Sequence, residues 1–585
     1  MRYSKRDCRI VLTVLLAVLV IFPALSTLKE TQAQNEVVVH LNLKFDMDTL
    51  NPFVYSSYTA GTVLRKIYES MFIMSRNGSY IPWLAERWEI SEDAKTYTFY
   101  LRKGIKWHDG HPFTSADVAY TFQLNIDYNF HPEVTKHIVK IETPDEYTVR
   151  FTLNESLVTF IWRAGTLMIA PKHIWEKIEE PDKYDNPNPI GTGPFKFVEW
   201  ATEQHVILEK NPDYWQEGKP HIDKIVYHVM PNVEAAIMAL KAGQLDVVEN
   251  VMPNMLGALV GIPNVSVYMS PVINNRWLGF NLRRYPMNLR LFRKAVSIAI
   301  DKKAILSDVL YNVGFLGSDG FVMPVLKYWY NPKAAWKGAN MTDEERIALA
   351  NQWLDAIGST VGEDGVRVMP NGTRLEFDLL TLGDYPTFVR SAEIIKESLE
   401  KVGIKINVVP LETGTVIDIV YYSNFDYDMF MMGCSYAPDP DFLWLEFYAS
   451  PPNPAWEAEC ENYKNETLDY YLDLQRRTAD MEKRREYVFK CQEILADDVP
   501  VVVLWHKTYI DAYRTDRFTG WIPEEGIMGI LTLINLEPIK PPETPAPTSP
   551  TPTPAPAKVP GWVYGVVIVA AIAVIASLAY AFSKK

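Results

Sequence analysis

The chain has 585 residues, of which 48% are hydrophobic and 12% aromatic, and its formal net charge is −14. A chain of this length exceeds what one hydrophobic core usually serves, so we expect two or more lobes. The negative charge argues against nucleic acid or an anionic membrane surface as the partner. The aromatic residues supply flat faces for stacking as well as core packing.

The amino end carries a segment typical of exported proteins. Arg2, Lys5 and Arg6 precede an apolar run over 10–25, and this pattern predicts a secretory signal peptide over 1–33. Cys8 stands before the apolar run rather than after it. We therefore expect no lipid anchor at this end.

The carboxyl end carries a segment typical of anchored proteins. Residues 541–560 consist mainly of Pro, Thr, Ala and Ser, which predicts an extended stalk. Residues 561–582 contain no charge and are long enough to cross a bilayer as a transmembrane helix. Lys584 and Lys585, in the tail 583–585, favour the cytoplasmic side, so we expect the globular part to be extracytoplasmic at the cell membrane.

Three cysteines remain in the exported part, Cys434, Cys460 and Cys491. They are too few for a disulfide scaffold, and no Cys-x-x-Cys or His/Cys spacing indicates zinc. One disulfide with a leftover thiol and three free thiols both stay open. Glycosylation is permitted in this compartment by Asn-x-Ser/Thr sequons at Asn77, Asn154, Asn264, Asn340, Asn371 and Asn465.

Residues 85–122 read as one supersecondary unit. Apolar residues alternate with polar ones over 96–102, which is the period of a half-buried strand. Asp109-Gly110 is a turn signal, and Thr114 with Asp117 resembles a capping box that opens a helix. The expected buried face of that helix consists of Val118, Phe122 and Ile126.

The same stretch resembles the signature of the family 5 (cluster C) extracytoplasmic solute-binding proteins, which serve ABC importers of peptides, sugars or nickel. The matching positions include Trp88, Lys95 to Phe99, Leu101 to Gly104, His108 to Gly110, Pro112 to Thr114, and Asp117-Val118. A framework role is favoured for these residues. The signal peptide, stalk and terminal helix together are similar to archaeal membrane-anchored surface receptors.

Further blocks of the chain follow in the order typical of this family. Gly191 to Phe197 resembles its Gly-Thr-Gly-Pro-Tyr segment, and Asn211 to Trp215 resembles its Asn-Pro-x-Tyr-Trp segment. Residues 275–281 predict a strand and 288–301 a helix, at the point where the family's chain crosses to its second lobe. Strand, helix and strand over 375–410 then predict a mixed or parallel sheet.

The resemblance implies an α/β, two-lobed periplasmic-binding-protein-like (type II, cluster C) fold with a hinge. We expect lobe one over 36–275 and 507–540, and lobe two over 276–506. The implied function is an extracytoplasmic receptor that captures an oligosaccharide or oligopeptide between its lobes and delivers it to ABC permease subunits in the membrane. We expect a monomer with no cofactor and no resident metal.

The loop over 433–441 departs from the family pattern. Peptide-binding members have Gly-Trp-Ser/Thr-x-Asp here, and the Asp binds the amino group of the peptide. In this chain Cys434 stands in place of the Trp, and no residue is a clear equivalent of the Asp. A buried ammonium group needs a paired carboxylate, so uncharged polyols are slightly favoured over free-amine peptides.

The candidate ligand-binding residues come from three stretches of the sequence. Asp46 and Tyr55 lie in the loop that borders the cleft in the resembled family. Trp277, Tyr436 and Trp444 are candidate aromatic platforms, for which a core role is equally favoured. Asp439 is a possible substitute for the missing carboxylate, although capping of its own loop is the favoured role. The remaining candidates are Asn281 and Ser435.

Two alternatives come from other functional classes. A surface-anchored hydrolase acting on polysaccharide or peptide would use paired carboxylates such as Asp439 and Asp441, but these flank Pro440 and no Gly-x-Ser-x-Gly or His-Glu-x-x-His motif is present. His108 and His111 flank the Asp-Gly turn, where a structural role is favoured over metal binding. A structural surface-layer protein is the other alternative, and it would show no ligand-dependent change in stability or shape.

Overall fold

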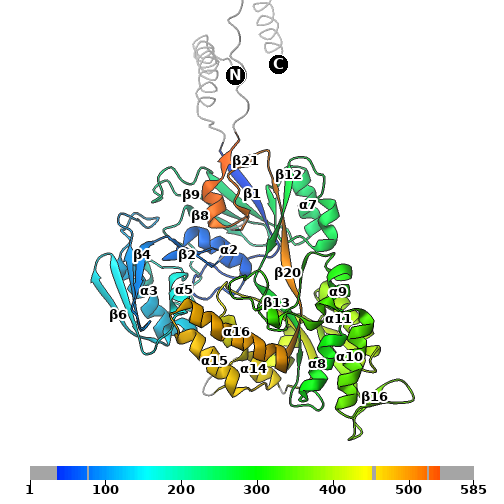
Figure 1. The fold of residues 1–585 in the computed structure, drawn as a ribbon. Coiled ribbons are helices and arrows are strands. Elements are labelled where there is room, and N and C mark those ends of the chain that lie inside the picture. Colours follow the sequence, from blue (N-terminus) through cyan, green and yellow to red (C-terminus); the bar gives the residue numbers. More distant parts are fainter. Residues whose placement is uncertain (1–35, 76–77, 424, 451–455, 524–525, 540–585) are drawn as a thin grey trace, which may run out of the picture. The chain divides into compact units, whose positions relative to one another are not determined.

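A computed structural model describes residues 36–539, apart from 76–77, 424, 451–455 and 524–525 (Figure 1). The signal peptide predicted over 1–33, the stalk over 541–560, the membrane helix over 561–582 and the tail over 583–585 lie outside the described residues. Within the described part, no helix is long and apolar enough to cross a membrane. The chain divides into two units after Pro538, and the described helices and strands belong to the first.

A mixed twelve-stranded sheet forms the centre of this unit. Parallel pairs join β17 to β18 and β1 to β10, whereas β13 runs antiparallel to both β19 and β20. β12 (Val265–Pro271) and β14 (Gly314–Leu316) also pair with β20. Along the sheet the order is β18 (Lys405–Leu411), β17 (Glu376–Leu382), β19 (Met429–Ser435), β13 (Asn274–Phe280), β20 (Val501–Arg514), β11 (Val247–Val248), β1 (Val38–Leu43), β10 (Lys224–Val229), β9 (His205–Lys210) and β8 (Phe195–Ala201).

Strand β20 is shared between two parts of the sheet. Its first half pairs with β13, and its second half pairs with β12 from Thr508 onward. The lobe boundaries expected at 275/276 and 506/507 therefore fall inside β13 and β20. Strand β20 runs continuously through both parts of the sheet, and the chain also crosses between them at residues 272–273, between β12 and β13.

Separate apolar cores lie on the two sides of this crossing. The largest draws its residues from 273–505, and we call this part lobe two. Two others are built around β1 with α2 and around a four-stranded sheet, and we call this part lobe one. The helices of lobe two are α8 (Arg290–Ala299), α9 (Lys302–Ala304), α10 (Asp343–Ala356), α11 (Pro386–Glu400), α12 (Thr413–Ile417), α13 (Phe442–Phe447), α14 (Trp456–Glu461), α15 (Glu466–Arg477) and α16 (Met481–Asp498).

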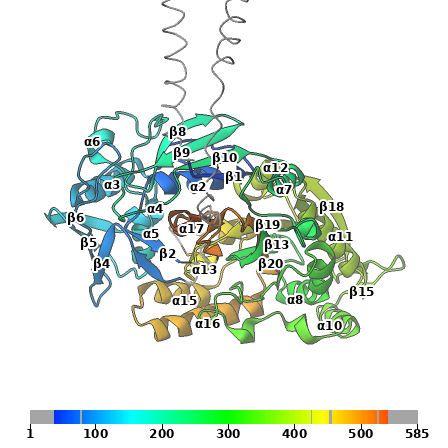
Figure 2. The ribbon, with the colours of Figure 1, turned by 90° about the horizontal axis from the view of Figure 1, so that it is seen from above.

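Lobe one carries shorter helices and the second, smaller sheet. Figures 1 and 2 show this sheet on the opposite side of the unit from α8, α10 and α11, with α15 and α16 running side by side. The sheet has the order β4 (Ala85–Ile90), β5 (Thr96–Leu101), β7 (Thr148–Leu153) and β6 (Ile138–Asp145), and β2 (Phe72–Met74) pairs with β3 (Tyr80–Pro82). The helices are α2 (Tyr58–Ile67), α3 (Ser115–Tyr128), α4 (Pro132–Thr135), α5 (Phe160–Gly165), α6 (Lys172–Trp175), α7 (Val233–Lys241) and the late α17 (Ile530–Asn535).

The supersecondary unit predicted over 85–122 is present. The capping box is confirmed, since the backbone N–H of Thr114 donates to Asp117 Oδ2 over 2.9 Å at the start of α3. Phe122 packs on Phe151 of β7, with ring centroids 4.5 Å apart. Ile126 is 36% exposed, so the prediction that it belongs to the buried face was wrong. Leu124 and Asn125 are the buried residues of this part of the helix instead.

The glycines of the Gly191-Thr192-Gly193 segment let this segment pack closely on the end of α2. A Cβ at Gly191 would lie 1.8 Å from the carbonyl oxygen of Ile67, and one at Gly193 would lie 2.3 Å from that of Lys66. His108 completes the contact, because its backbone N–H donates to Gly191 O over 2.8 Å and its Nε2 lies 2.9 Å from Gly193 O. Two blocks that resemble the family signature therefore form one framework joint.

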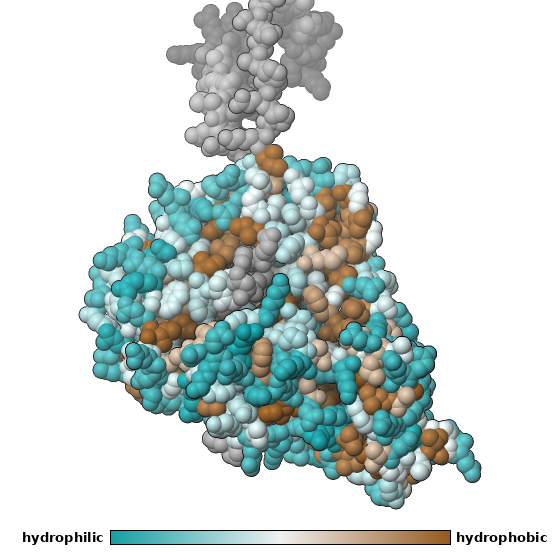
Figure 3. Space-filling model, viewed as in Figure 1, coloured by the Kyte–Doolittle hydropathy of each residue, from teal (hydrophilic) through white to brown (hydrophobic). Residues whose placement is uncertain are grey.

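The surface is largely hydrophilic on the face shown in Figure 3, with apolar areas at the upper right over α7 and β12. Met238 of α7 and Met269 of β12 are among the exposed apolar side chains. The cysteines whose pairing the sequence leaves open form no disulfide with one another, and Cys434 is exposed whereas Cys460 and Cys491 are buried.

Candidate functional site

Three cations gather where the lobes meet, and we call Lys44, Arg276 and Lys507 the cationic floor. Lys44 follows β1, whereas Arg276 and Lys507 are half-buried residues of β13 and β20. Lys507 Nζ donates to Asn250 Oδ1 of lobe one over 2.7 Å. Arg276 Nη1 donates to the carbonyl oxygens of Asn275 and, in lobe two, Cys434, over 2.7 and 3.1 Å.

A glycine on the neighbouring strand gives Arg276 its place. A Cβ at Gly433 of β19 would lie 2.1 Å from Arg276 Cδ, so the arginine side chain lies flat over this position. Any larger residue at 433 would displace the guanidinium group. Gly433, which matches the family pattern, thus determines where the charge of Arg276 lies.

The cationic floor holds positive charge that no ion pair within the described part of the chain neutralises. Burial lowers the pKa of Lys507 to about 7, and repulsion from Arg276 and Lys44 acts in the same direction, with Asp511 opposing. Burial also lowers the pKa of Arg276. Among the described residues, none of these three cations has an ion-paired carboxylate, and they contact carbonyl and amide oxygens and the Phe45 ring instead.

An apolar cavity of ≈ 370 Å³ lies on the lobe-one side, with Ala437 of the 433–441 loop in its wall. Phe72, Met74, Trp83 and Trp162 supply the aromatic and apolar lining. Ala437 belongs to the segment where peptide-binding members of the resembled family carry their carboxylate. The wall of this cavity therefore offers no loop carboxylate to an ammonium group.

Glu69 is the carboxylate that lines this cavity, and its oxygens are already engaged. Glu69 Oε1 accepts hydrogen bonds from Trp83 Nε1 over 2.6 Å and from the Tyr214 hydroxyl over 2.8 Å. Burial raises its pKa to about 7, against hydrogen bonds from Thr192, Tyr214 and the two tryptophans, which lower it. Glu69 therefore holds Trp83 and Tyr214 together within lobe one.

A second cavity, of ≈ 190 Å³, shares Arg65, Trp162 and Thr166 with the first. Tyr55, predicted as a binding residue, lines it, and the Tyr55 hydroxyl accepts a hydrogen bond from Arg65 Nη2 over 3.4 Å. Arg65 adds a fourth cation to the region between the lobes. Its other contact is with the carbonyl oxygen of Thr166.

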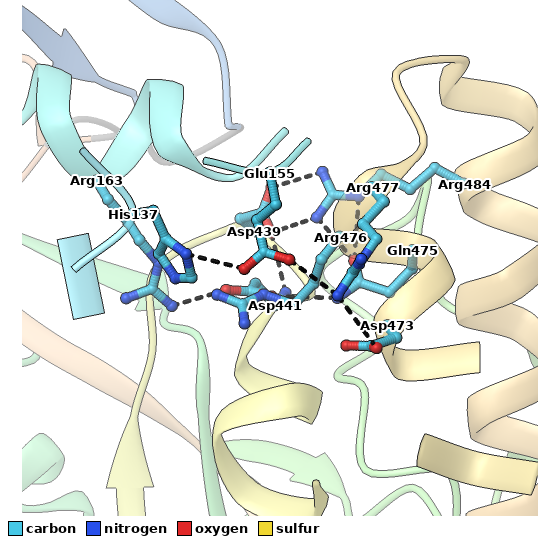
Figure 4. Close-up of polar contacts among 10 residues, drawn as sticks. All are labelled: His137, Glu155, Arg163, Asp439, Asp441, Asp473, Gln475, Arg476, Arg477 and Arg484. Carbon is cyan, nitrogen blue, oxygen red and sulfur yellow. Dashed lines mark hydrogen bonds and ion pairs between the residues drawn. The ribbon is translucent and has the colours of Figure 1, made fainter. Parts of the chain in front are cut away.

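The two aspartates of the 433–441 loop form ion pairs within the protein (Figure 4). Arg484 donates to both oxygens of Asp439, over 2.6 and 2.9 Å. Asp441 is fully buried and pairs with Arg163 of lobe one at 2.7 Å and with Arg476 of α15 at 2.9 Å. Burial raises the pKa of Asp441, but Arg476 and Arg163 outweigh it and lower the pKa to about 2.

A second bridge between the lobes runs beside this network. Glu155 of lobe one pairs with His137 at 3.0 Å and with Arg477 of α15 at 2.9 Å (Figure 4). Burial lowers the pKa of His137, while Glu155 opposes the shift. The carboxyl end of α15 therefore docks on lobe one through charges as well as through the hydrogen bond from Val158 N to Arg476 O.

Several predicted site residues lie inside the protein. Trp277 is 1% exposed and packs edge-on against Phe321. Asn281 is also 1% exposed, and its amide donates to the carbonyl oxygens of Phe425 and Tyr427. Asp46 accepts hydrogen bonds from Trp200 Nε1 and Glu203 N, which tie the loop after β1 to the β8–β9 hairpin.

The other predicted residues lie nearer to open space. Ser435 is exposed at the end of β19. Tyr436 is half-buried and stacks on Phe442, with centroids 4.8 Å apart. Trp444 lines a cavity of ≈ 270 Å³ where α15 meets lobe one, but Tyr448 stacks on its ring and the Arg476 guanidinium lies 3.9 Å from the ring centroid. Contacts within the protein already occupy this ring.

The structure thus places Ser435 and Tyr436 at the end of β19 and Tyr55 in the wall of a lobe-one cavity, and it assigns internal partners to the rest. Sequence reasoning missed Arg276, Lys507 and Arg65. One signal was available for Arg276, since a single cation interrupts an otherwise uncharged strand over 274–280. Nothing comparable distinguished Lys507 or Arg65.

Comparison with known proteins places this geometry in a family. The model of the bacterial extracellular solute-binding proteins, family 5 (middle), matches residues 79–454, which is more than half of the chain. The chain belongs to this family. It is an extracytoplasmic solute-binding receptor of the kind that serves ABC transporters, and the members of the family are binding proteins rather than enzymes.

Individual relatives agree with this assignment. The di/tripeptide-binding protein 1 of Pseudomonas aeruginosa is 27% identical over 493 residues, covering 78% of this chain and 87% of the relative. The ABC transporter substrate-binding protein CtaP of Listeria monocytogenes superposes with a TM-score of 0.74 at 25% identity, covering 86% of this chain and all of CtaP.

A neighbour with another ligand has the same two-lobed fold. The periplasmic oligopeptide-binding protein of Thermotoga maritima was solved with bound mannohexaose, and it superposes with a TM-score of 0.70 at 24% identity. The superposition covers 86% of this chain and 99% of the Thermotoga chain. This likeness shows the fold.

Proposed function

We propose that this receptor binds an oligomer with an acidic group, either an oligopeptide or an oligosaccharide, with the acid held at the cationic floor between the lobes. The observation that carries the proposal is that Lys44, Arg276 and Lys507 converge without an ion-paired carboxylate among the described residues. A bound carboxylate would supply the missing negative charge through charge-assisted hydrogen bonds.

The same site disfavours a free amino group as the main anchor. Asp439 and Asp441 are both paired with arginines, and Ala437 lines the apolar cavity. An ammonium group placed there would meet no carboxylate of the loop, and Glu69 in the cavity wall is already engaged by Trp83 and Tyr214, so its burial would be costly. The relatives support an oligomeric solute, because one is named for di- and tripeptides and another was solved with a hexasaccharide.

Capture would proceed by closure of the lobes about β20 and the neighbouring crossing between β12 and β13. We assign lobe one to 36–275 with 507–540 and lobe two to 276–506, with the bending at 274–276 and 505–507. The liganded, closed form then docks on the membrane permease, and ATP hydrolysis elsewhere drives import. The monomer suffices for this cycle, since each lobe contributes its own wall of the cleft.

Tethering would keep the receptor near its permease. The sequence supports a cleaved signal over 1–33, a stalk over 541–560 and a single membrane helix over 561–582. A tether of this kind raises the effective concentration of the receptor at the permease without tightening any contact.

A thermal-shift panel on the purified protein tests the proposal. It compares free and N-acetylated di- to pentapeptides, uronic-acid oligosaccharides and neutral oligosaccharides. A ligand present at 100 times its Kd adds roughly 2.7 kcal/mol of stability. The proposal predicts shifts with N-acetylated peptides or with acidic sugars. A shift with the peptides identifies a peptide carboxylate as the ligand group, and a shift with the sugars identifies a uronic acid. Shifts confined to neutral sugars, or to peptides with a free amine, would contradict it.

A further inference from the structure

Two imidazoles and a carboxylate meet on the surface of lobe one, far along the chain from the 433–441 loop. Asp109 and His111 lie in the turn before α3, and His173 lies in α6. His173 Nε2 is 2.7 Å from Asp109 Oδ2, and His111 Nδ1 is 3.2 Å from Asp109 Oδ1. One ligand atom from each of the three residues lies within 4.8 Å of the others.

From this geometry we propose that Asp109, His111 and His173 form a binding site for a divalent transition-metal ion such as Zn²⁺ or Ni²⁺. The proposal is independent of the solute, since none of the three residues lines the cavities between and beside the lobes. The ion would join the turn that carries Asp109 to α6.

The distances suit a metal of this size. Two ligand atoms bound to Zn²⁺ at roughly 2.1 Å in tetrahedral geometry lie about 3.4 Å apart. The two His–Asp separations, 2.7 and 3.2 Å, are of this order but run to different oxygens of Asp109, so the carboxylate would bind through both oxygens or turn to present one. Imidazole nitrogens favour zinc, nickel or copper over Mg²⁺ and Ca²⁺, which prefer oxygen ligands. Three protein ligands leave a position for water.

The backbone holds the three ligands in place. Trp107 N donates to His111 O over 2.8 Å, and Gly110 N donates to Trp107 O over 2.8 Å, which closes the turn. Lys172 N donates to Asp117 Oδ1 over 3.0 Å, which ties the start of α6 to α3. The rings of His111 and His173 stack with centroids 4.1 Å apart and planes 22° apart, so both imidazoles are already side by side. Because an imidazole nitrogen binds a metal in the plane of its ring, the nearly parallel rings would rotate about their side-chain torsions to reach one ion.

His108 belongs to the same turn but not to the site. Its ring faces Gly191 and Gly193 in the framework joint. Among the described residues, no other group of three His, Cys, Asp or Glu side chains brings its ligand atoms this close together. His205 and Glu199, at 2.6 Å, form an exposed pair of the same chemistry with only two members, and this pair is the matched control.

Isothermal titration of Zn²⁺ and of Ni²⁺ into the chelator-treated full chain tests the proposal. We expect one saturable ion per chain, weakened at least tenfold by His111→Ala and by His173→Ala and unchanged by His205→Ala. Mg²⁺ should not compete. Absorption of a Co²⁺ adduct in the visible range should appear in the wild type and be lost in both histidine variants.

Folding controls keep the test decisive. Asp109→Asn retains hydrogen-bonding capacity but removes the charge, so it should weaken metal binding while the metal-free melting temperature stays close to that of the wild type. Absence of saturable binding in the wild type would overturn the proposal. Binding that survives both histidine substitutions would also overturn it, because the ion would then lie elsewhere.

Discussion

Asp441 joins two arginines that lie far apart in the sequence, Arg163 in lobe one and Arg476 in α15. Asp441→Asn would leave both guanidinium groups buried without a full counter-charge, and loss of one member of a buried ion pair costs about 3–5 kcal/mol. We expect a decrease of this size in the free energy of unfolding, measured by urea titration. The control is Glu199→Gln in an exposed pair, for which a change within about 0.5 kcal/mol is expected. Equal effects of the two substitutions would contradict the network.

Lys507 gives the receptor a defined pH dependence. Its pKa of about 7 lies below its ordinary value of 10.5, because burial and the neighbouring cations favour the neutral amine. A bound acid favours the charged form, so the affinity for an acidic solute should be highest below pH 7 and should fall as the pH rises through that value. Calorimetry between about pH 5.5 and 9 measures this trend.

The folded protein alone should behave in the opposite way. Between about pH 7 and 10.5 the unfolded chain holds a proton on Lys507 that the folded chain releases, so Lys507 makes stability rise with pH over this range. Glu69 also has a pKa of about 7, so both groups titrate in the same pH range. Lys507→Met removes the contribution of the lysine and leaves that of Glu69. An affinity that keeps its pH dependence in Lys507→Met would rule out this lysine as the source.

At the scale of elements, the joint between Gly191 and the end of α2 predicts a selective substitution effect. Gly191→Ala places a Cβ 1.8 Å from the backbone carbonyl oxygen of Ile67, which has no rotamer to change. Overpacking of this kind costs about 1–3 kcal/mol. Gly257→Ala is the control, because a Cβ added there would have no neighbour within 4 Å. Chemical denaturation should show the loss for Gly191→Ala alone.

The elements themselves could largely be predicted, because their signals are local. The parallel pair β17 and β18, joined by α11, follows from a strand–helix–strand pattern ending in the Gly403 turn. The error at Ile126 has a plain cause: each step of four residues turns about 40° around the helix, so after two steps from Val118 the buried position is Asn125 and not Ile126. Periodicity in the sequence indicates which face of a helix is apolar, but the surface packed against that face decides which of its residues are buried.

At the scale of the whole molecule, the site could be predicted only in part. The altered 433–441 loop showed that a carboxylate was missing, and Tyr55 does line a cavity. Arg276 and Lys507 escaped notice because their meeting depends on β13 and β20 crossing between the lobes, a pairing of residues more than two hundred positions apart. The partners that occupy Asp439 and Asp441 are equally distant or lie on other helices.

The most direct test of the central claim compares one oligomer in two forms, with a free carboxylate and with that carboxylate converted to a carboxamide. Titration calorimetry with the wild type and with Lys507→Met gives the four affinities of a double-mutant cycle. The account predicts that the wild type prefers the carboxylate by at least tenfold and that Lys507→Met loses most of this preference. Equal affinity of the wild type for the two forms would contradict an acidic solute held at the cationic floor.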